Sequence, residues 1–281
     1  MYSRDETVNA VLKFYQEIIR HPYLDDDALI LPPPDGWESI TIDNPHKKTE
    51  TVLDLLHHLP YLQAKGMYDR YIIAWETVPI CYVGYNFWGK GREEYLALPP
   101  HCVYLAHSVD REGTSLILNT DEGTITEYSI TGGHITVIYE EFDALPEADK
   151  WKVYRTTPVT EFFEGWTQRY QKLVWMLTPS TRSGETMGTL YSRADNTPQE
   201  EELLLQERLE PWHPDKTTHE DDQEGHAEQV RHAAAVYNTY LRYGWPHNFR
   251  KEQCRSELLE LERKYEEDMW QRMREMDPES E

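Results

Sequence analysis

The side chains of this sequence that could bind a metal ion are its histidines, cysteines and carboxylates. His57 and His58 are adjacent near the end of a helical segment, and neighbouring side chains of a helix point about 100° apart, so they do not converge on one ion. His213, His219 and His226 lie among carboxylates, but their spacing matches no zinc signature. In so acidic a stretch we expect a solvated surface. The sequence predicts no metal site.

Catalytic and nucleotide-binding motifs are missing from the sequence, which contains no nucleophile elbow, P-loop, dinucleotide fingerprint or HExxH. The glycines of GYNFWGKGREEY, residues 84–95, lack the spacing of a phosphate loop and favour a flexible strand connection. Cys81, Cys102 and Cys254 form no CxxC pair, which argues against a disulfide framework and a zinc finger. We expect Cys81 and Cys102 to be buried thiols. We predict no catalytic residue and no cofactor.

Aromatic side chains make up 12% of the chain, and they suit either a sugar groove or a protein interface. A carbohydrate-binding module is one alternative function, with stacking platforms at Trp37, Trp75, Tyr85 and Trp88. The other interpretation of these four residues is that they are core and rim aromatics of the fold. A hydrolase of unrecognised type is a further alternative. In that case we expect a deep pocket that contains His57, Glu76 or Glu94. The sequence leaves the enzyme question open and favours a protein without catalytic activity.

The chain carries 51 acidic and 28 basic residues, a formal net charge of −23. Such a field repels phosphate backbones and anionic lipid, so we expect neither nucleic acid nor a membrane surface as a partner. It favours a protein partner with a basic surface. The first residues lack the basic and apolar pattern of a signal peptide, which predicts a cytoplasmic location, with the nucleus as the alternative. The oligomeric state is not predicted.

The elements that would position these residues begin with two amphipathic helices. Apolar residues repeat at the helical period over 7–20 and again over 48–58, where Pro60 ends the stripe. Three consecutive prolines, 32–34, exclude a helix between them and predict an extended loop that ends at Gly36-Trp37. We expect Trp37 to pack over the second helix.

From residue 71 the pattern changes to short β-branched and aromatic runs. Glycine-containing turns separate several of them, at residues 110–113, 120–123 and 131–133. This pattern predicts an antiparallel β-meander of about four to six strands over 71–140. A broad apolar stripe then predicts a closing helix over 158–177. Helices, a meander and a closing helix define an α+β fold rather than a βαβ alternation.

The remaining residues divide into an acidic stretch and two helices. Residues 195–228 hold 12 acids and two bases. Because such charges repel one another, we predict an acidic linker or partly disordered loop over 178–226, with a short helical patch at 200–208. Helical periodicity returns over 227–243 and 249–276. The predicted domains are an α+β globular core over 1–177, the linker, and C-terminal helices over 227–281 that either dock on the core or stand apart.

Four segments carry a resemblance to known proteins. VLKFYQEIIRHPYL is followed by PPPDGWESI and by a helix ending in LLHHLPYL, and YLRYGWPHNFRKEQC lies nearer the C-terminus. In this order they resemble a group of uncharacterised filamentous-fungal proteins, over about 1–177 and 235–255. More distantly, the order of helices, meander and closing helix is similar to the SUKH superfamily, which includes a fungal cell-wall-synthesis regulator and bacterial toxin-immunity proteins.

The SUKH resemblance implies a protein that acts by binding another protein, and it brings no catalytic residues. The acidic charge points in the same direction. We therefore predict a non-enzymatic, SUKH-like protein-binding or regulatory protein with an acidic surface.

Overall fold

The computed structural model describes residues 2–42, 45–66, 69–84, 98–180, 186–194, 198–214 and 224–276 of the 281-residue chain. Its contacts divide the chain into two compact units. Unit 1 comprises Met1–Ile19, Asp26–Thr167 and Gly184–Thr186, and unit 2 comprises Arg20–Asp25, Gln168–Ser183 and Met187–Glu281. Neither unit is therefore one continuous stretch of sequence.

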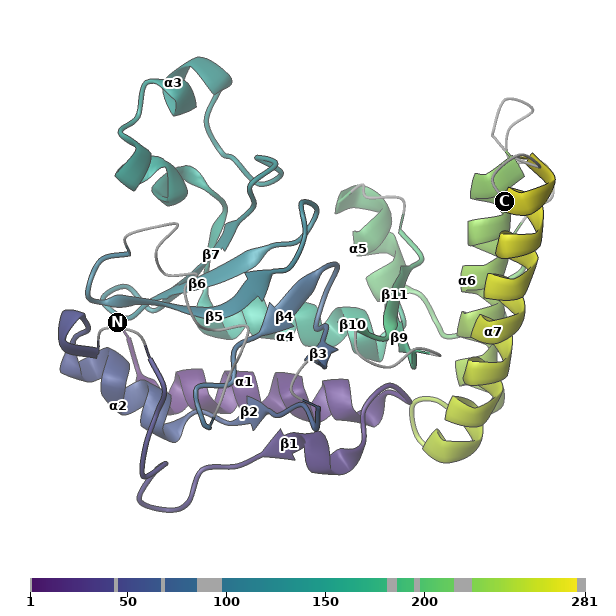
Figure 1. Cartoon of the computed structure of the whole chain (residues 1–281), viewed down its shortest axis with the longest axis horizontal. Coiled ribbons are helices and arrows are strands. Elements are labelled where there is room, and N and C mark those ends of the chain that lie inside the picture. The colour runs from purple at the N-terminus through teal and green to yellow at the C-terminus, as the bar shows by residue number, and fades with distance from the viewer. Residues whose placement is uncertain are drawn as a thin grey trace. The chain divides into compact units, whose positions relative to one another are not determined.

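Helix α1, Arg4–Arg20, covers the first helical range expected from the apolar period and begins a few residues earlier (Figure 1). Its buried stripe packs within unit 1 against α4, Val159–Gln171. The ring centroids of Phe14 on α1 and Phe163 on α4 are 5.4 Å apart. The two helices are thus joined by aromatic packing.

Helix α2, Glu50–His58, also lies where its period predicts. The hydroxyl of Thr49 caps its first turn by accepting a hydrogen bond from the Val52 N–H at 3.3 Å. The shorter elements of unit 1 are the 3-10 helices η1 (Asp26–Ala28), η2 (Pro45–Lys47) and η3 (Glu147–Val153), and the strands β1 (Leu29–Ile30), β2 (Tyr61–Leu62) and β3 (Arg70–Tyr71). Strands β1 and β2 pair antiparallel.

A five-stranded antiparallel sheet belongs to unit 1, with its strands in sequence order. They are β4 (Thr77–Pro79), β5 (Cys102–Ser108), β6 (Ser115–Asn119), β7 (Thr124–Tyr128) and β8 (Thr156–Pro158). The first four strands form the expected meander. Gly123, in the turn between β6 and β7, has a φ of 73°, which is the left-handed conformation that its turn signal predicts. The α+β prediction is confirmed.

The fifth strand comes from an unexpected segment. The run at 134–140 was expected to be a strand, but it forms one isolated bridge, Ile135 with Tyr154, before the short helix α3, Tyr139–Asp143. The free edge of β7 is instead paired by β8, residues 156–158, whose last residue was expected to be the first of the closing helix. Strand β7 is thus paired with a segment that follows it only after residues 129–155 of the chain.

Unit 2 contains a β-hairpin and three helices in its described part. They are β9 (Trp175–Thr178), β11 (Thr189–Ser192), α5 (Pro198–Gln206), α6 (Glu224–Arg242) and α7 (Lys251–Met276). Strand β10, Thr186–Met187, lies at the boundary between the units in the sequence. Strands β9 and β11 pair antiparallel with Leu177 opposite Leu190. Helices α6 and α7 pack together and against β9, around a core of Leu173, Met176, Val236, Tyr237, Tyr240, Trp245, Cys254 and Leu258.

Two features of the chain after residue 158 differ from the sequence-based expectation. The helix expected over 158–177 ends at Gln171, because Leu173 adopts a φ of 50° and the chain continues into β9. The range 178–226, expected as an acidic linker or loop, contains β11 and α5, and α5 matches the expected helical patch. No helix within the described ranges is long and apolar enough to cross a membrane.

Candidate functional site

Trp37 is held against the end of α2 by three hydrogen bonds. Its backbone N–H donates to the carbonyl of His57 at 2.8 Å, and its indole N–H donates to the carbonyl of Leu59 at 2.8 Å. The Nδ1–H of His57 donates in return to the Trp37 carbonyl at 2.5 Å. Trp37 is half-buried and lies against the C-terminal end of α2, the helix over which it was expected to pack. Its indole N–H is therefore already used inside the protein.

The other expected sugar-stacking residues are placed differently. Trp75 is 55% exposed, in the turn between β3 and β4. Tyr85 and Trp88 lie outside the described residues. Within the part that the structure describes, no ring contact joins Trp37 to Trp75. The four-residue sugar platform stays a prediction.

The structure describes Glu76, one of the two glutamates named for the hydrolase alternative, and both thiols that were expected to be buried. Cys102 is buried, whereas Cys81 is half-buried. The carboxylate of Glu76 accepts a hydrogen bond from the backbone N–H of Glu112 at 2.9 Å, and Glu94 lies outside the described ranges. Burial raises the pKa of Cys102 to about 12 and also raises the pKa of Cys81. Both thiols therefore stay protonated at neutral pH, which makes them poor nucleophiles.

An excursion of the chain between β7 and β8, residues 129–155, carries α3 away from the sheet of unit 1 (Figure 1). Its two sides are joined at the base, where the Arg155 N–H donates to the His134 carbonyl at 2.8 Å and the Thr136 N–H donates to the Val153 carbonyl at 2.9 Å. Such a closed base limits how far the excursion moves as a loop.

The base is also held by a two-point ion pair. The Nε and Nη2 of Arg155 donate to the two carboxylate oxygens of Glu127 at 2.5 and 2.7 Å. The Glu127 side chain is only 5% exposed, whereas that of Arg155 is 49% exposed. Pairs of this two-point kind fix geometry as well as charge.

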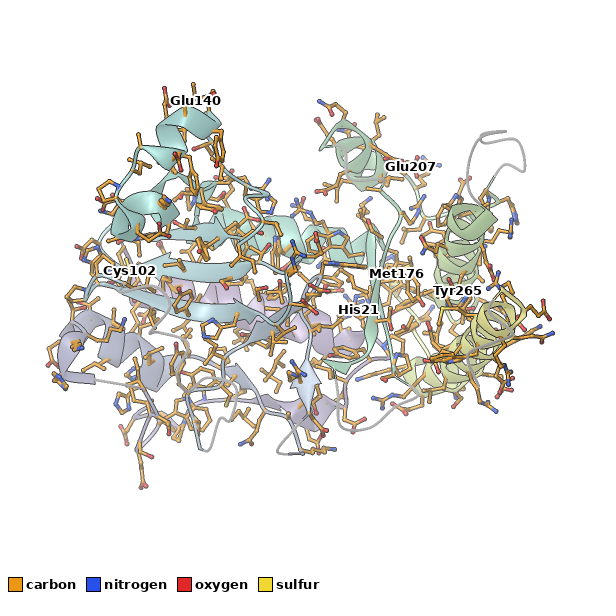
Figure 2. The ribbon with its side chains drawn as sticks, turned by 45° about the horizontal axis from the view of Figure 1, so that its top comes forward. His21, Cys102, Glu140, Met176, Glu207 and Tyr265 are labelled. Atoms are coloured by element: carbon orange, nitrogen blue, oxygen red, sulfur yellow. The ribbon has the colours of Figure 1, made fainter. Side chains whose placement is uncertain are left out.

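The outer end of the excursion combines apolar and acidic side chains. We call residues 138–141 the tip: Ile138 is 62% exposed, Tyr139 is 73% exposed, and Glu140 and Glu141 are exposed. Neither glutamate of the tip forms an ion pair with any residue that the structure describes. Figure 2 shows Glu140 at the outer end of α3. Behind the tip, Phe142 packs 6.1 Å from Tyr154, ring centroid to ring centroid.

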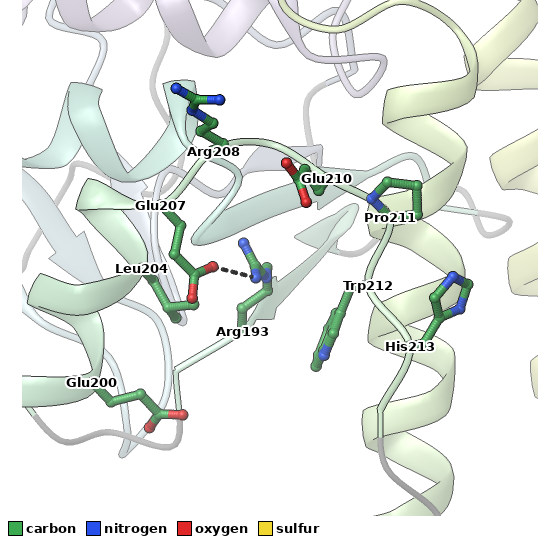
Figure 3. A pocket seen from close by; sticks show the side chains of 9 residues that line it. All are labelled: Arg193, Glu200, Leu204, Glu207, Arg208, Glu210, Pro211, Trp212 and His213. Carbon is green, nitrogen blue, oxygen red and sulfur yellow. Dashed lines mark hydrogen bonds and ion pairs between the residues drawn. The ribbon is translucent and has the colours of Figure 1, made fainter.

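A pocket of about 570 Å³ lies within unit 2, between α5 and the segment 208–213 (Figure 3). Its lining residues are Arg193, Glu200, Leu204, Glu207, Arg208, Glu210, Pro211, Trp212 and His213. The lining thus mixes cations, carboxylates and an apolar wall. A pocket of this size accommodates a small molecule, for which about 300–1,000 Å³ is usual.

Arg193 is the buried charge of this pocket. Its side chain is 7% exposed, and its guanidinium carbon lies 4.3 Å from the ring centroid of Tyr237 and 5.3 Å from that of Trp212. One nitrogen, Nη2, donates to a carboxylate oxygen of Glu207 at 3.1 Å. In the described part of the chain, Nε and Nη1 are buried without a hydrogen-bond partner.

The walls of the pocket are anchored to the rest of unit 2. The Nε of Arg169 donates to Glu201 on α5 at 2.6 Å, and the Nζ of Lys172 donates to the carbonyl of Glu207 at 3.2 Å. The segment that carries Trp212 is bound to α6 through the side chain of Asn238. These contacts hold α5 and the Trp212 segment in place, so the pocket is preformed.

A second polar cluster of unit 2 lies between β11, α6 and α7. The hydroxyl of Tyr191 donates to Glu262 at 2.8 Å, and the Nε2 of His232 lies 3.4 Å from the other carboxylate oxygen. The ring of Tyr265 stacks on His232 with centroids 4.0 Å apart. Burial and the Glu262 charge raise the pKa of Tyr191, which keeps its hydroxyl protonated. The described residues contain no group of three or more side chains suited to hold a metal ion.

In comparisons with known proteins, no protein-family model, no curated protein and no solved structure matches the chain.

The pocket and the tip were both missed by the sequence analysis. Arg193 gives no signal in the sequence, because arginine is usually exposed and its burial depends on the β9–β11 pairing. The tip gave a weak signal, since YEEF follows directly after an apolar run. That run was predicted to be a strand of the sheet, so Ile138 and Tyr139 were not expected to be exposed.

Proposed function

We propose that the chain is a non-enzymatic protein that binds another protein, and that the tip of unit 1 is the contact. The observation that carries the proposal is the exposure of Ile138 and Tyr139 beside two glutamates that form no ion pair with the described residues. A soluble protein exposes large apolar side chains next to one another mainly where another surface covers them. Tyrosine is also among the residues that contribute most to binding energy at interfaces.

The chemistry of the tip describes its partner. Glu140 and Glu141 attract cations, and the two apolar side chains need a dry apolar surface. A basic protein surface with an apolar depression satisfies both requirements. The net charge of −23 steers such a partner toward the chain over longer distances. A binding role of this kind also agrees with what the SUKH resemblance implies.

Capture from a native lysate, compared between variants, tests the proposal. The variant Ile138→Ser/Tyr139→Ser removes the apolar part of the tip, and Leu203→Ser is the matched control, because Leu203 is 65% exposed in unit 2. We expect wild type and control to capture the same specific protein and the tip variant to lose it. If all three forms capture the same proteins, the tip is not the contact.

The charge of the tip is tested on the captured partner. Raising the salt concentration from about 50 to about 500 mM should slow association while dissociation changes little, because steering acts on the association rate. Glu140→Lys/Glu141→Lys should reduce that salt dependence. A partner without a basic surface, or an unchanged salt dependence, would contradict the acidic recognition.

A further inference from the structure

The buried guanidinium of Arg193 lacks hydrogen-bond acceptors. Its side chain is more than nine-tenths buried, yet its single carboxylate partner, Glu207, is itself 51% exposed. Two of its nitrogens have no acceptor among the described residues. Buried donors in proteins are nearly always paired, and a buried charge without full pairing is costly. An acceptor supplied from outside the chain could pair with Nη1, one of these two nitrogens.

From this we infer that the pocket binds a small zwitterion of the amino-acid type, whose carboxylate is held by Arg193. This inference is independent of the function proposed for the tip. The carboxylate of the ligand takes the place of the Glu207 carboxylate, whose half-exposed side chain can turn into solvent. A carboxylate accepts from Nη1 and Nη2 together across the end of the planar guanidinium, so one hydrogen bond is replaced by two.

Three carboxylates, those of Glu200, Glu207 and Glu210, line the pocket against two arginines, Arg193 and Arg208, so its net charge disfavours a simple anion. Figure 3 shows the carboxylates of Glu200 and Glu210 on either side of Arg193. They repel a dianion such as phosphate and attract an ammonium group. A ligand that satisfies Arg193 without this repulsion therefore carries one negative and one positive group.

The apolar lining describes the remainder of the ligand. Leu204, Pro211 and Trp212 face the same pocket. They offer an apolar wall to a hydrocarbon or aromatic side chain. An apolar amino acid unites a carboxylate, an ammonium and such a side chain within the size that this pocket admits.

Isothermal titration calorimetry on the full chain tests the ligand class with four probes. They are L-phenylalanine, 3-phenylpropionate without the ammonium, 2-phenylethylamine without the carboxylate, and inorganic phosphate. We expect phenylalanine to bind at least about tenfold more tightly than each of the others, since each loses a charged hydrogen-bonding group. The inference is overturned if phenylalanine shows no saturable binding. It is equally overturned if the amine, the acid or phosphate binds as tightly as phenylalanine.

Variants test the role of Arg193. Arg193→Gln should abolish phenylalanine binding, whereas the matched control Arg263→Gln, at an exposed arginine of the same unit, should keep it. Because Arg193→Gln also removes packing and could fail to fold, Glu207→Gln is the second variant. It keeps Arg193 and removes the competing carboxylate, so it should tighten binding several-fold. Unchanged or weaker binding by Glu207→Gln would show that the ligand does not replace Glu207.

Discussion

The side chain of Asn238 binds both backbone groups of Trp212. Its amide nitrogen donates to the Trp212 carbonyl at 2.8 Å, and its amide oxygen accepts from the Trp212 N–H at 2.8 Å. The Asn238 side chain thus pairs with the N–H and the carbonyl of one residue, as the backbone of a neighbouring β-strand would. This pair holds Trp212 in the wall of the pocket.

Replacing this side chain should loosen the segment. Asn238→Ala leaves two partly buried backbone groups without their partner, which we expect to cost about 1–3 kcal/mol. Asn238→Asp keeps the acceptor and loses the donor, so its cost should be smaller. Urea unfolding followed by tryptophan fluorescence measures both. Equal stability of all three proteins would show that water replaces the amide without cost.

The turn at Gly36 offers a matched pair of glycines. Gly36 has a φ of 83°, and a Cβ at this position would lie 2.9 Å from the carbonyl oxygen of His57. Gly84 has a φ of 76°, but its nearest neighbour, a side-chain atom of Gln63, is 3.9 Å away. Both Gly→Ala substitutions carry the backbone penalty of about 1–2 kcal/mol. Gly36→Ala should cost clearly more, by the close approach to His57, and chemical denaturation of both variants measures the difference.

Substitutions of Trp37 test whether this residue has a structural role or a role in partner recognition. Trp37→Ala should lower the free energy of unfolding by about 3 kcal/mol, the low end for a large aromatic, because the ring is half-buried. Trp37→Phe keeps most of the ring and loses the hydrogen bond to Leu59, at a cost of about 1 kcal/mol. If Trp37→Ala costs less than about 1 kcal/mol and abolishes partner binding, Trp37 is a recognition residue instead.

Local patterns predicted the first part of the chain well. The helical period located α1 and α2, and glycine turn signals located the hairpins from β5 to β7, because these features depend on neighbours in the sequence. The closing helix was extended too far, since the apolar run Leu173–Leu177 fits a buried strand as well as a helix. The run forms a strand rather than a helix because it pairs with β11, which lies more than ten residues later in the chain.

The candidate sites depend even more on distant pairing. Arg193 is buried because the β9–β11 hairpin places it under α5 and Trp212. The excursion exists because residues 156–158, rather than 134–140, pair with β7. Neither choice has a local signature, so neither site was predictable from composition or period.

We expect the free energy of unfolding to fall at acidic pH because of the buried His21. Its Nδ1 lies 2.9 Å from the Tyr240 hydroxyl, and that hydroxyl donates to the Leu177 carbonyl at 2.6 Å, so the Nδ1–H of His21 is the donor to Tyr240. Burial lowers the pKa of His21 well below 6.5, and the cations Arg20 and Lys251 lower it further. Between this lowered pKa and about 6.5, the unfolded chain binds a proton that the folded chain does not. The contribution of His21 to stability is therefore complete above about pH 6.5 and falls by up to about 1.4 kcal/mol per pH unit below it.

Unfolding measured between pH 7.5 and pH 5 checks this slope. His21→Gln should flatten it relative to wild type. His134→Gln is the control, because burial and the Arg155 charge also lower the pKa of His134, which is less buried. A slope unchanged by His21→Gln would mean that other groups cause the acid sensitivity.

The ion pair of Glu127 and Arg155 is expected to hold the excursion at its base. Arg155→Met leaves the Glu127 carboxylate buried without its cation, at an expected cost of about 2–3 kcal/mol, less than a fully buried pair because Arg155 is half-exposed. Lys152→Met is the matched control, since its pair with Asp149 is exposed on both sides and should cost less than about 0.5 kcal/mol. The double variant Glu127→Gln/Arg155→Met should recover much of the loss, because a neutral amide needs no cation. Urea unfolding gives the three costs, and hydrogen exchange of residues 129–155 reports whether the base opens. An Arg155→Met protein as stable as Lys152→Met, with unchanged exchange, would mean that the backbone hydrogen bonds alone close the base.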